Sequence, residues 1–308
     1  MLYDLIIIGG GPGGAAAAIY AARKQLRTLL VTSDFGGQSI VSEDIQNWIG
    51  TPTITGADLA KNLKNHVLTY AGAIVEIQEE QKVISVEKIE GGFSIKTDGD
   101  NTYTTKTILS CAGSSRRKLT VPGAERLEHK GLTYCASCDG PMFSNMDVAV
   151  IGGGNAGIET AAQLLAYTKS VTLINRSETF RADEITVKKV LSNPKITVIK
   201  NADIAEITGE KFVEGIKIKD KKTGEEKIVK VAGIFVEIGQ IPNTNFIKNL
   251  VDLDEYGRVK IDPWTQSSST VGIWAAGDCT NALYHQNNIA VGDAIKAAEN
   301  IYLHLHTK

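Results

Sequence analysis

Apolar runs, glycine clusters and alanine-rich stretches follow one another at the start of this chain. Residues 5–8 are consecutive aliphatic residues, residues 9–14 are rich in glycine, and residues 15–22 are mostly alanine. A short continuous apolar run is typical of a strand that is buried on both faces of a parallel sheet. The pattern predicts a strand, a tight turn and a helix.

The same order of features recurs in the middle of the chain. Residues 148–151 are apolar, residues 152–157 are again rich in glycine, and residues 158–163 have a helix-forming composition. An internal duplication of strand, turn and helix predicts two structurally equivalent units in one chain.

Periodicity predicts further elements. Amphipathic spacing indicates a helix over residues 56–70 with Thr55 as its capping residue, and a last helix over residues 289–303. The apolar segment 270–278 is expected to be a strand that delivers Asp278 to its carboxyl end, where open α/β sheets bind ligands. Alternating apolar and polar residues predict antiparallel strands at 73–78, 82–88 and 92–96.

Composition and charge limit the number of domains and the kinds of partner that this chain can have. The chain has 308 residues, 43% hydrophobic and 22% charged, with a net charge of −2. Such a chain is long enough for two domains, and its charge argues against nucleic acid or an anionic membrane surface as a partner. The apolar run at 5–8 is too short to span a membrane and has no basic segment before it. We therefore expect no membrane association and a cytoplasmic location.

The first glycine cluster has the spacing G-x-G-x-x-G. Its first glycine, Gly9, makes the tight turn, Gly11 lets the backbone approach a pyrophosphate, and Gly14 allows the helix to pack on the strand. The pyrophosphate then meets the free N–H groups of the helix. The second cluster repeats this dinucleotide-binding spacing at Gly152, Gly154 and Gly157.

The residues after the next strand of each copy distinguish the two sites. In the first copy Asp34 is the acidic candidate for a ribose hydroxyl, with a loop cap as the alternative. In the second copy this position reads Asn175-Arg176, and Arg181 follows. Two arginines favour a 2′-phosphate and therefore NADPH over NADH; the alternative is that both are solvated surface charges.

A pair of cysteines precedes the second glycine cluster. Cys135 and Cys138 form a C-x-x-C motif, and Asp139 follows directly and could carry a proton during thiol chemistry. Alone, the motif fits half a zinc site, a structural disulfide or a redox pair. Zinc would need two further close ligands, and the near candidate is His129. We expect no metal site, and in the reducing cytosol a disulfide is usually catalytic or redox-sensing.

Together these motifs identify a family. The chain resembles the low-molecular-weight thioredoxin reductases, and equally the catalytic portion of the alkyl hydroperoxide reductase flavoprotein subunit. The resemblance covers essentially the whole chain. It rests on the motifs at 9–14, 36–38, 47–48, 135–140, 152–157, 242–244 and 276–278.

The resemblance implies an α/β fold with two Rossmann-like dinucleotide-binding domains, the second inserted in the first. Residues 1–116 and 247–308 are expected to form the FAD-binding domain. Residues 117–246 are expected to form the NAD(P)H-binding domain, which carries the C-x-x-C motif. The resemblance further implies a homodimer.

The resemblance also implies an activity, that of an NADPH-dependent thioredoxin-disulfide reductase. Electrons would pass from NADPH through FAD and a Cys135–Cys138 disulfide to thioredoxin, or to a thioredoxin-like or glutaredoxin-like carrier that is a separate protein. Cys138 matches the thiol that faces the flavin, Cys135 the thiol that exchanges with the carrier, and Asp139 the proton donor.

Two sets of cofactor contacts follow from the matched motifs. The FAD contacts are Gly9, Gly11, Pro12, Gly14, Gly37, Gln38, Asn47, Gly113, Gly277, Asp278 and Gln286. The NADPH contacts are Gly152, Gly154, Asn155, Gly157, Asn175, Arg176 and Arg181.

One departure from the family pattern leaves alternatives open. Thioredoxin reductases usually carry His-Arg-Arg and then Phe-Arg for the NADP phosphate, whereas this chain has Asn175-Arg176-Ser177 and then Phe180-Arg181. A first alternative is a related enzyme that is reduced by ferredoxin or another flavin. A second alternative is a flavin-binding protein whose cysteines sense redox state without turnover.

Overall fold

The computed structural model describes residues 2–42, 45, 47–72, 74–134 and 136–307. The chain forms two compact units, an outer unit of residues 1–115 and 241–308 and an inserted unit of residues 116–240. Each unit is built around a mainly parallel sheet, so the predicted α/β class and the presence of two strand–turn–helix units are confirmed.

The outer unit is organised around β1, whose two faces are both buried. Leu5 and Ile7 point into one core cluster, whereas Ile6 and Ile8 point into another on the opposite face. This two-residue period is that of a strand, and it explains why the run reads as continuously apolar.

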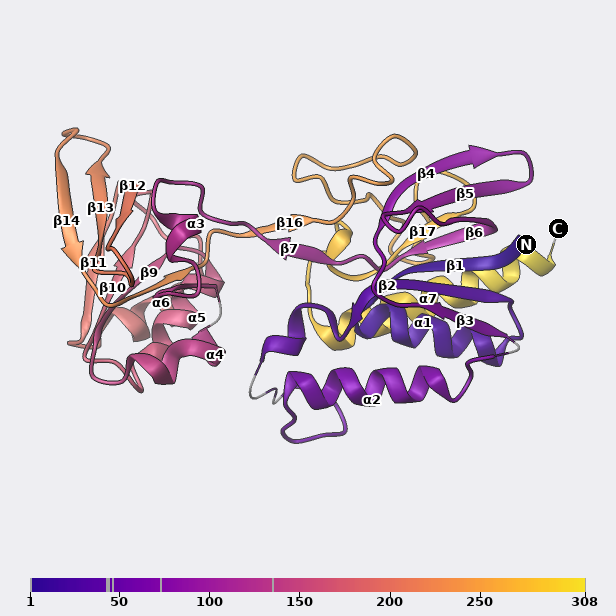
Figure 1. Cartoon of the computed structure of the whole chain (residues 1–308), viewed down its shortest axis with the longest axis horizontal. Helices are drawn as coiled ribbons and strands as arrows, with labels where there is room; N and C mark the ends of the chain where they lie inside the picture. Colours follow the sequence, from indigo (N-terminus) through magenta and orange to yellow (C-terminus); the bar gives the residue numbers. More distant parts are fainter. Residues whose placement is uncertain (1, 43–44, 46, 73, 135, 308) are drawn as a thin grey trace. The chain divides into compact units, whose positions relative to one another are not determined.

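The sheet of the outer unit has the order β3-β2-β1-β6-β5-β4, and β17 also pairs with β6 (Figure 1). Pairing of β1 with β2 and β6, of β2 with β3 and of β6 with β17 is parallel, whereas β4, β5 and β6 form an antiparallel set. The strands are β1 (Leu2–Gly10), β2 (Thr28–Phe35), β3 (Val75–Gln78), β4 (Val83–Ile89), β5 (Gly92–Thr97), β6 (Thr102–Ser110) and β17 (Ile273–Ala275).

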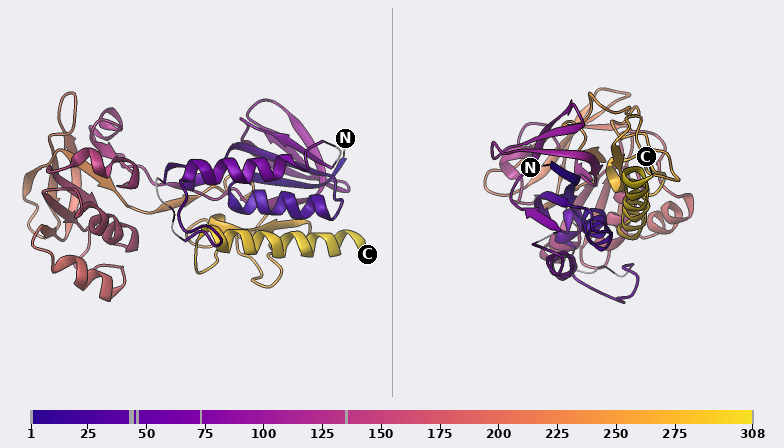
Figure 2. Two further views of the ribbon diagram at one scale, coloured as in Figure 1. Left: turned by 90° about the horizontal axis from the view of Figure 1, so that it is seen from below. Right: turned by 90° about the vertical axis from the view of Figure 1, so that its right-hand side faces the viewer.

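Three helices lie along one face of this sheet, as both views of the outer unit show (Figures 1 and 2): α1 (Pro12–Arg23), α2 (Gly56–Leu68) and α7 (Asn287–His306). Helices α1 and α7 meet through small buried side chains, among them Ala17, Ala21, Ala294 and Ala297. Thr55 caps α2 as predicted, because its side chain accepts a hydrogen bond from the backbone N–H of Asp58. Among the described residues, no helix has both the length and the apolar content needed to cross a membrane.

The inserted unit repeats the arrangement with the strand order β11-β10-β9-β15-β8, all parallel. Helix α5 packs on one face through Ile158, against Val148 and Val150, and the three-stranded antiparallel sheet β12-β13-β14 covers the other face. The strands are β8 (Leu132–Thr133), β9 (Asp147–Ile151), β10 (Ser170–Ile174), β11 (Ile196–Ile199), β12 (Ala202–Thr208), β13 (Gly215–Asp220), β14 (Glu226–Lys230) and β15 (Gly233–Val236). The helices are α3 (Ala124–Leu127), α4 (Ala136–Asp139), α5 (Asn155–Leu164) and α6 (Glu184–Leu191), with a 3-10 turn η2 (Gly140–Phe143).

The two segments that join the units pair with each other. They are β7 (Ser114–Arg116) and β16 (Gln240–Pro242), which form a two-stranded sheet. The predicted insert of residues 117–246 differs from the observed unit mainly at this second crossing. Residues 241–246 group with the outer unit because Asn243 bonds the backbone of Gly113 and Ala112 and Phe246 packs in an outer-unit core.

One strand differs from its prediction in direction. The segment predicted at 73–78 as part of an antiparallel set is β3, which pairs in parallel with β2 at the edge of the main sheet. The alternation of its side chains reflects an edge position with one covered face, and alternation alone does not report strand direction.

Candidate active site

The first glycine turn connects β1 to α1 and leaves an open space where a pyrophosphate would approach. Gly9 has a φ of +107°, and a Cβ atom at Gly14 would lie 1.8 Å from the carbonyl oxygen of Gly9. At Gly11, by contrast, a Cβ would meet nothing closer than the Cα of Gly37, at 3.9 Å. The three glycines thus serve the tight turn, the close packing and the open cradle that a dinucleotide requires.

Several segments that are distant in sequence enclose this first turn. Gly37 begins the 3-10 turn η1 (Gly37–Val41), and a Cβ on it would lie 3.5 Å from the Cα of Gly11. Helix α7 lies over the other side, since a Cβ at Gly13 would be 3.0 Å from the carbonyl oxygen of Ala290. A Cβ at Gly277 would lie 3.1 Å from the Cβ of the same alanine.

Polar side chains from four segments are hydrogen-bonded around the same region. Gln38 donates through Nε2 to Ser114 Oγ at 2.9 Å, and Asn47 donates through Nδ2 to Gln286 Oε1 at 3.0 Å. The remaining predicted FAD contacts, Pro12 and Gly113, also belong to the outer unit, Pro12 as the first residue of α1. The residues expected to hold FAD therefore all lie in one compact unit.

Asp278 lies in η3 (Gly277–Cys279), just beyond the carboxyl end of β17. Burial raises the pKa of its carboxyl group, whereas the nearby His285 and a hydrogen bond with Ser114 act in the opposite direction. A carboxylate with so little water around it is well suited to accept a hydrogen bond from a ligand hydroxyl.

The second glycine turn, between β9 and α5, repeats the geometry of the first. Gly152 has a φ of +135°, and a Cβ at Gly157 would lie 2.2 Å from the carbonyl oxygen of Gly152. A Cβ at Gly154 would meet nothing within 4 Å. The second turn therefore also fits a pyrophosphate at the start of a helix, with Asn155 as the first helical residue.

Three of the expected NADPH contacts, two of them the arginines predicted to bind the 2′-phosphate, have different environments. Asn175 is buried, and its Nδ2 donates to the carbonyl oxygens of Ser177 and Thr179 at 2.8 and 2.9 Å, so its amide orders the loop that follows β10. Arg176 is 80% exposed and its Nε lies 3.5 Å from Asp203 Oδ1. Arg181 is exposed, and its backbone N–H bonds the carbonyl oxygen of Gly153 at 2.8 Å. Arg181 is thus joined to the second glycine turn through its backbone, and Arg176 follows the neighbouring strand β10.

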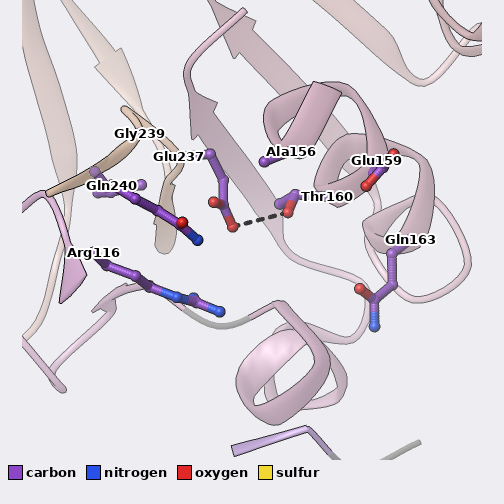
Figure 3. A pocket seen from close by; sticks show the side chains of 9 residues that line it. Arg116, Ala156, Glu159, Thr160, Gln163, Glu237, Gly239 and Gln240 are labelled. Atoms are coloured by element: carbon purple, nitrogen blue, oxygen red, sulfur yellow. Dashed lines mark hydrogen bonds between the residues drawn. The ribbon is translucent and has the colours of Figure 1, made fainter. Parts of the chain in front are cut away.

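A pocket of about 350 Å³ lies within the inserted unit, beside the second glycine turn (Figure 3). It lies beside the carboxyl end of β15, and the strand order changes direction between β15 and its neighbour β9, where such sheets usually bind ligands. Helix α5 provides one wall and the joining strands β7 and β16 provide another. The lining residues are Arg116, Ala156, Glu159, Thr160, Gln163, Val236, Glu237, Gly239 and Gln240.

Glu237 is the partly buried carboxyl group of this pocket. It follows β15 directly, and Thr160 of α5 donates through Oγ1 to Glu237 Oε1 at 3.0 Å (Figure 3). Burial raises the pKa of the Glu237 carboxyl group, and Glu159 raises it further, whereas Arg116 and the Thr160 hydroxyl oppose that shift. The sequence interpretation missed Glu237, although an acidic residue at the carboxyl end of a buried strand was the same signal that identified Asp278.

The cysteine motif lies only partly within the described residues. Cys135 lies outside them, and so does the side chain of Cys138, whose backbone belongs to the four-residue helix α4. The carboxyl group of the following Asp139 accepts a hydrogen bond from the Thr133 hydroxyl at the end of β8. The expected Cys135–Cys138 disulfide therefore remains a prediction from sequence.

Comparison with curated proteins finds relatives along nearly the whole chain. An NADH dehydrogenase of Bacillus subtilis is 39% identical over 296 residues, covering 96% of this chain and 57% of the relative. An alkyl hydroperoxide reductase subunit of Staphylococcus epidermidis is 38% identical over 300 residues, covering 97% of this chain and 58% of the relative. The chain thus spans less than two thirds of the length of these relatives.

Solved structures match over their full length. The thioredoxin reductase of T. acidophilum superposes with a TM-score of 0.83 at 36% identity and covers 99% of both chains. That of Lactococcus lactis gives a TM-score of 0.84 at 34% identity, covering 97% of this chain and 98% of the other. The family model for pyridine nucleotide-disulphide oxidoreductases matches residues 3–298. The chain belongs to the pyridine nucleotide-disulphide oxidoreductase family, and its fold is similar to that of the solved thioredoxin reductases.

Proposed function

We propose that this protein is an FAD-dependent disulfide reductase that carries electrons from NADPH to a thioredoxin-like protein. The observation that carries the proposal is the pair of glycine turns with matching geometry in two separate units, with a C-x-x-C motif in the second. Two dinucleotide sites and one dithiol are the minimum set for moving two electrons from a nicotinamide to a disulfide.

In this proposal the outer unit holds FAD. The turn at Gly11 and the start of α1 would receive the pyrophosphate, and Asp278 would accept a hydrogen bond from a hydroxyl of the cofactor's sugar chain. Bound FAD supplies the relay between a two-electron hydride donor and a disulfide. Gln38, Asn47 and Gln286 would orient the cofactor through their amide groups.

The two cysteines perform the exchange with the carrier. Reduction of the Cys135–Cys138 disulfide by two electrons and two protons gives a dithiol. The Cys135 thiolate then attacks the carrier disulfide and forms a mixed disulfide, and Cys138 displaces the reduced carrier and restores the starting disulfide. Asp139, held by the Thr133 hydroxyl, would take and return a proton during these steps.

The preference for NADPH over NADH rests on Arg176 and Arg181. Both are exposed at the carboxyl edge of the inserted sheet, and the backbone of Arg181 is bonded to the glycine turn. This arrangement supports recognition of a 2′-phosphate beside the adenosine ribose. A relative of 39% identity is named NADH dehydrogenase, so NADPH and NADH are compared directly in the test below.

The test is an anaerobic titration of the FAD-loaded protein with NADPH and, separately, with NADH. We expect rapid bleaching of the flavin with NADPH, followed by reduction of added thioredoxin. A flavin that stays yellow with both nicotinamides would overturn the donor assignment and favour ferredoxin or another flavin as donor. Flavin reduction without turnover of thioredoxin or glutaredoxin-like disulfides would instead favour a redox sensor.

A further inference from the structure

We propose that Glu237 stabilises the positive charge that develops on the nicotinamide ring as it gives up a hydride. The proposal rests on the proposed function, since it needs a nicotinamide dinucleotide at the second glycine turn. It adds a charge-stabilising residue that the sequence motifs do not contain.

The nicotinamide half of a bound dinucleotide would lie on the Glu237 side of the second glycine turn. In this kind of site the adenosine ribose lies near the end of the strand that follows the glycine helix, which here is β10 with Arg176. The pyrophosphate would lie at the second glycine turn, between the adenosine half and the nicotinamide half of the dinucleotide. The nicotinamide half would therefore extend across β9 towards β15. The pocket that contains Glu237 lies on that side.

The pocket is lined by both acidic and basic side chains. Glu237 comes from the end of β15, Glu159 and Thr160 come from α5, and Arg116 comes from β7 (Figure 3). The Thr160 hydroxyl fixes one carboxyl oxygen of Glu237 at 3.0 Å. The carboxyl group is therefore held in one orientation while part of it still lines the pocket.

The equivalent position in the outer unit shows that the fold does not require an acid here. The backbone N–H of Glu237 bonds Ile151 of β9 at 2.8 Å, and a Cβ at Gly152 would lie 2.0 Å from the Glu237 carbonyl oxygen. Cys111 occupies the same position in the outer unit. Its N–H bonds Ile8 of β1 at 2.8 Å, and a Cβ at Gly9 would lie 2.3 Å from its carbonyl oxygen.

A neutral thiol thus satisfies the backbone geometry in one unit, whereas the other unit has a carboxyl group that carries a desolvation penalty. Groups that are unfavourable for folding are commonly retained where they serve a ligand. The acid at 237 is therefore best explained by what occupies the pocket.

The chemistry follows from the charge of the two nicotinamide states. A bound dihydronicotinamide would have a neutral ring, and after transfer of its hydride to the flavin that ring would be a pyridinium cation. A carboxylate beside the ring interacts more favourably with the cation than with the neutral ring, and so also with the transition state between them. Ionised Glu237 would therefore favour the oxidised dinucleotide, and protonation of Glu237 would remove that preference.

The experiment measures binding to the FAD-loaded protein by calorimetry, without turnover. The probes are NADP⁺ and tetrahydro-NADP, a neutral analogue in the sense that its nicotinamide ring is uncharged, and one that cannot donate a hydride. If NAD⁺ and tetrahydro-NAD bind more tightly, they replace this pair. We expect Glu237→Gln to weaken NADP⁺ about three- to tenfold, the range for a partly screened charge contact. Binding of the neutral analogue should stay within about twofold. In the wild type, the preference for NADP⁺ should also diminish as the pH falls through the raised pKa of Glu237.

The matched control is Glu210→Gln, which removes the same charge from an exposed residue of the same unit that does not line the pocket. It should change both affinities by less than about twofold, because an exposed charge is well screened. Equal weakening of both probes by Glu237→Gln, or no change in either, would overturn the charge role. Failure of the wild type to bind any of the four dinucleotides would overturn the proposed function itself, which is a distinct result.

Discussion

The two glycine turns have the same backbone geometry but very different surroundings. At the first turn, Pro12, Gly13 and Gly14 at the start of α1 are all buried, beneath η1 and α7. At the second turn, the matching residues Asn155 and Ala156 at the start of α5 are exposed, and only Gly157 is buried. One cradle is enclosed by segments that are distant in sequence, and the other opens outward.

This difference fits two different uses of one motif. An enclosed cradle retains its ligand, because release requires several segments to separate, as suits a tightly bound FAD. An open cradle lets a dinucleotide enter and leave in each catalytic cycle, as suits a nicotinamide substrate. In both turns the glycine spacing suits a pyrophosphate group. The surrounding segments would determine how fast the ligand is released.

The largest expected effect comes from Cys138→Ser, which should leave both cradles working and block the transfer of electrons from the flavin to the carrier protein. The variant should bind FAD and be bleached by NADPH. Its reduction of thioredoxin should fall by about a thousandfold or more, as for loss of an essential nucleophile. Stopped-flow absorbance for the flavin and a coupled thioredoxin assay measure the two halves separately. Substantial residual thioredoxin reduction would contradict the cysteine assignment.

The next prediction separates the two cradles with a matched pair, Gly11→Ala and Gly154→Ala. Both glycines have negative φ values, −68° and −92°, and an added Cβ would meet no protein atom closer than 3.9 Å, so alanine should fold normally. The methyl group would instead occupy the space of the pyrophosphate. We expect Gly11→Ala to lose FAD during purification, whereas Gly154→Ala keeps FAD and binds NADPH about ten- to a hundredfold more weakly.

Flavin content by absorbance and NADPH affinity by titration report the two outcomes, with far-ultraviolet circular dichroism as the folding control. If Gly154→Ala loses flavin while Gly11→Ala keeps it, the assignment of the cradles is reversed. If both variants retain both ligands at wild-type affinity, neither turn binds a pyrophosphate.

A smaller effect is expected from the arginines beside the second cradle. Arg176→Ala should raise the NADPH Michaelis constant by about tenfold and leave that of NADH nearly unchanged, because only NADPH has the 2′-phosphate. Asp203 Oδ1 lies 3.5 Å from Arg176 Nε, so the Asp203 carboxylate competes with the 2′-phosphate for the Arg176 guanidinium. Asp203→Asn should therefore change NADPH affinity in the opposite direction, by about twofold. Equal effects of Arg176→Ala on both nicotinamides would remove the phosphate role.

Sequence reasoning reached the fold because its main signals are local. The apolar run at 5–8 and the three glycines that follow it are fixed by steric needs within a few residues, and the same holds for the copy at 148–157. The capping of α2 by Thr55 is local in the same way. Such features can be read without knowing what lies nearby.

The parts that escaped depend on distant packing. The parallel direction of β3 is set by its pairing with β2, and the grouping of residues 241–246 with the outer unit is set by bonds from Asn243 to Gly113 and Ala112. The pocket at Glu237 likewise combines residues of β7, α5 and β15. No local pattern brings these together, so they became visible only in the structure.

The smallest expected effect concerns stability, and it tests whether the second cradle carries a functional acid at the position where the first carries Cys111. Burial raises the pKa of the Glu237 carboxyl group above its ordinary value of 4.5. A group whose pKa is higher in the folded state than in the unfolded chain adds most to the free energy of unfolding at a pH below its unfolded-state pKa. That contribution is lost as the pH rises through its folded-state pKa. At neutral pH the ionised carboxylate therefore carries a folding penalty that a neutral amide lacks.

Since Gln can still accept the Thr160 hydrogen bond, Glu237→Gln should raise the melting temperature of the FAD-loaded protein by about 1–2 °C at pH 7–8. The gain should shrink towards pH 4.5, and calorimetric scans across this range measure it. A lower melting temperature for the variant at neutral pH would mean that Glu237 stabilises the inserted unit through Arg116, and the contrast with Cys111 would then be structural.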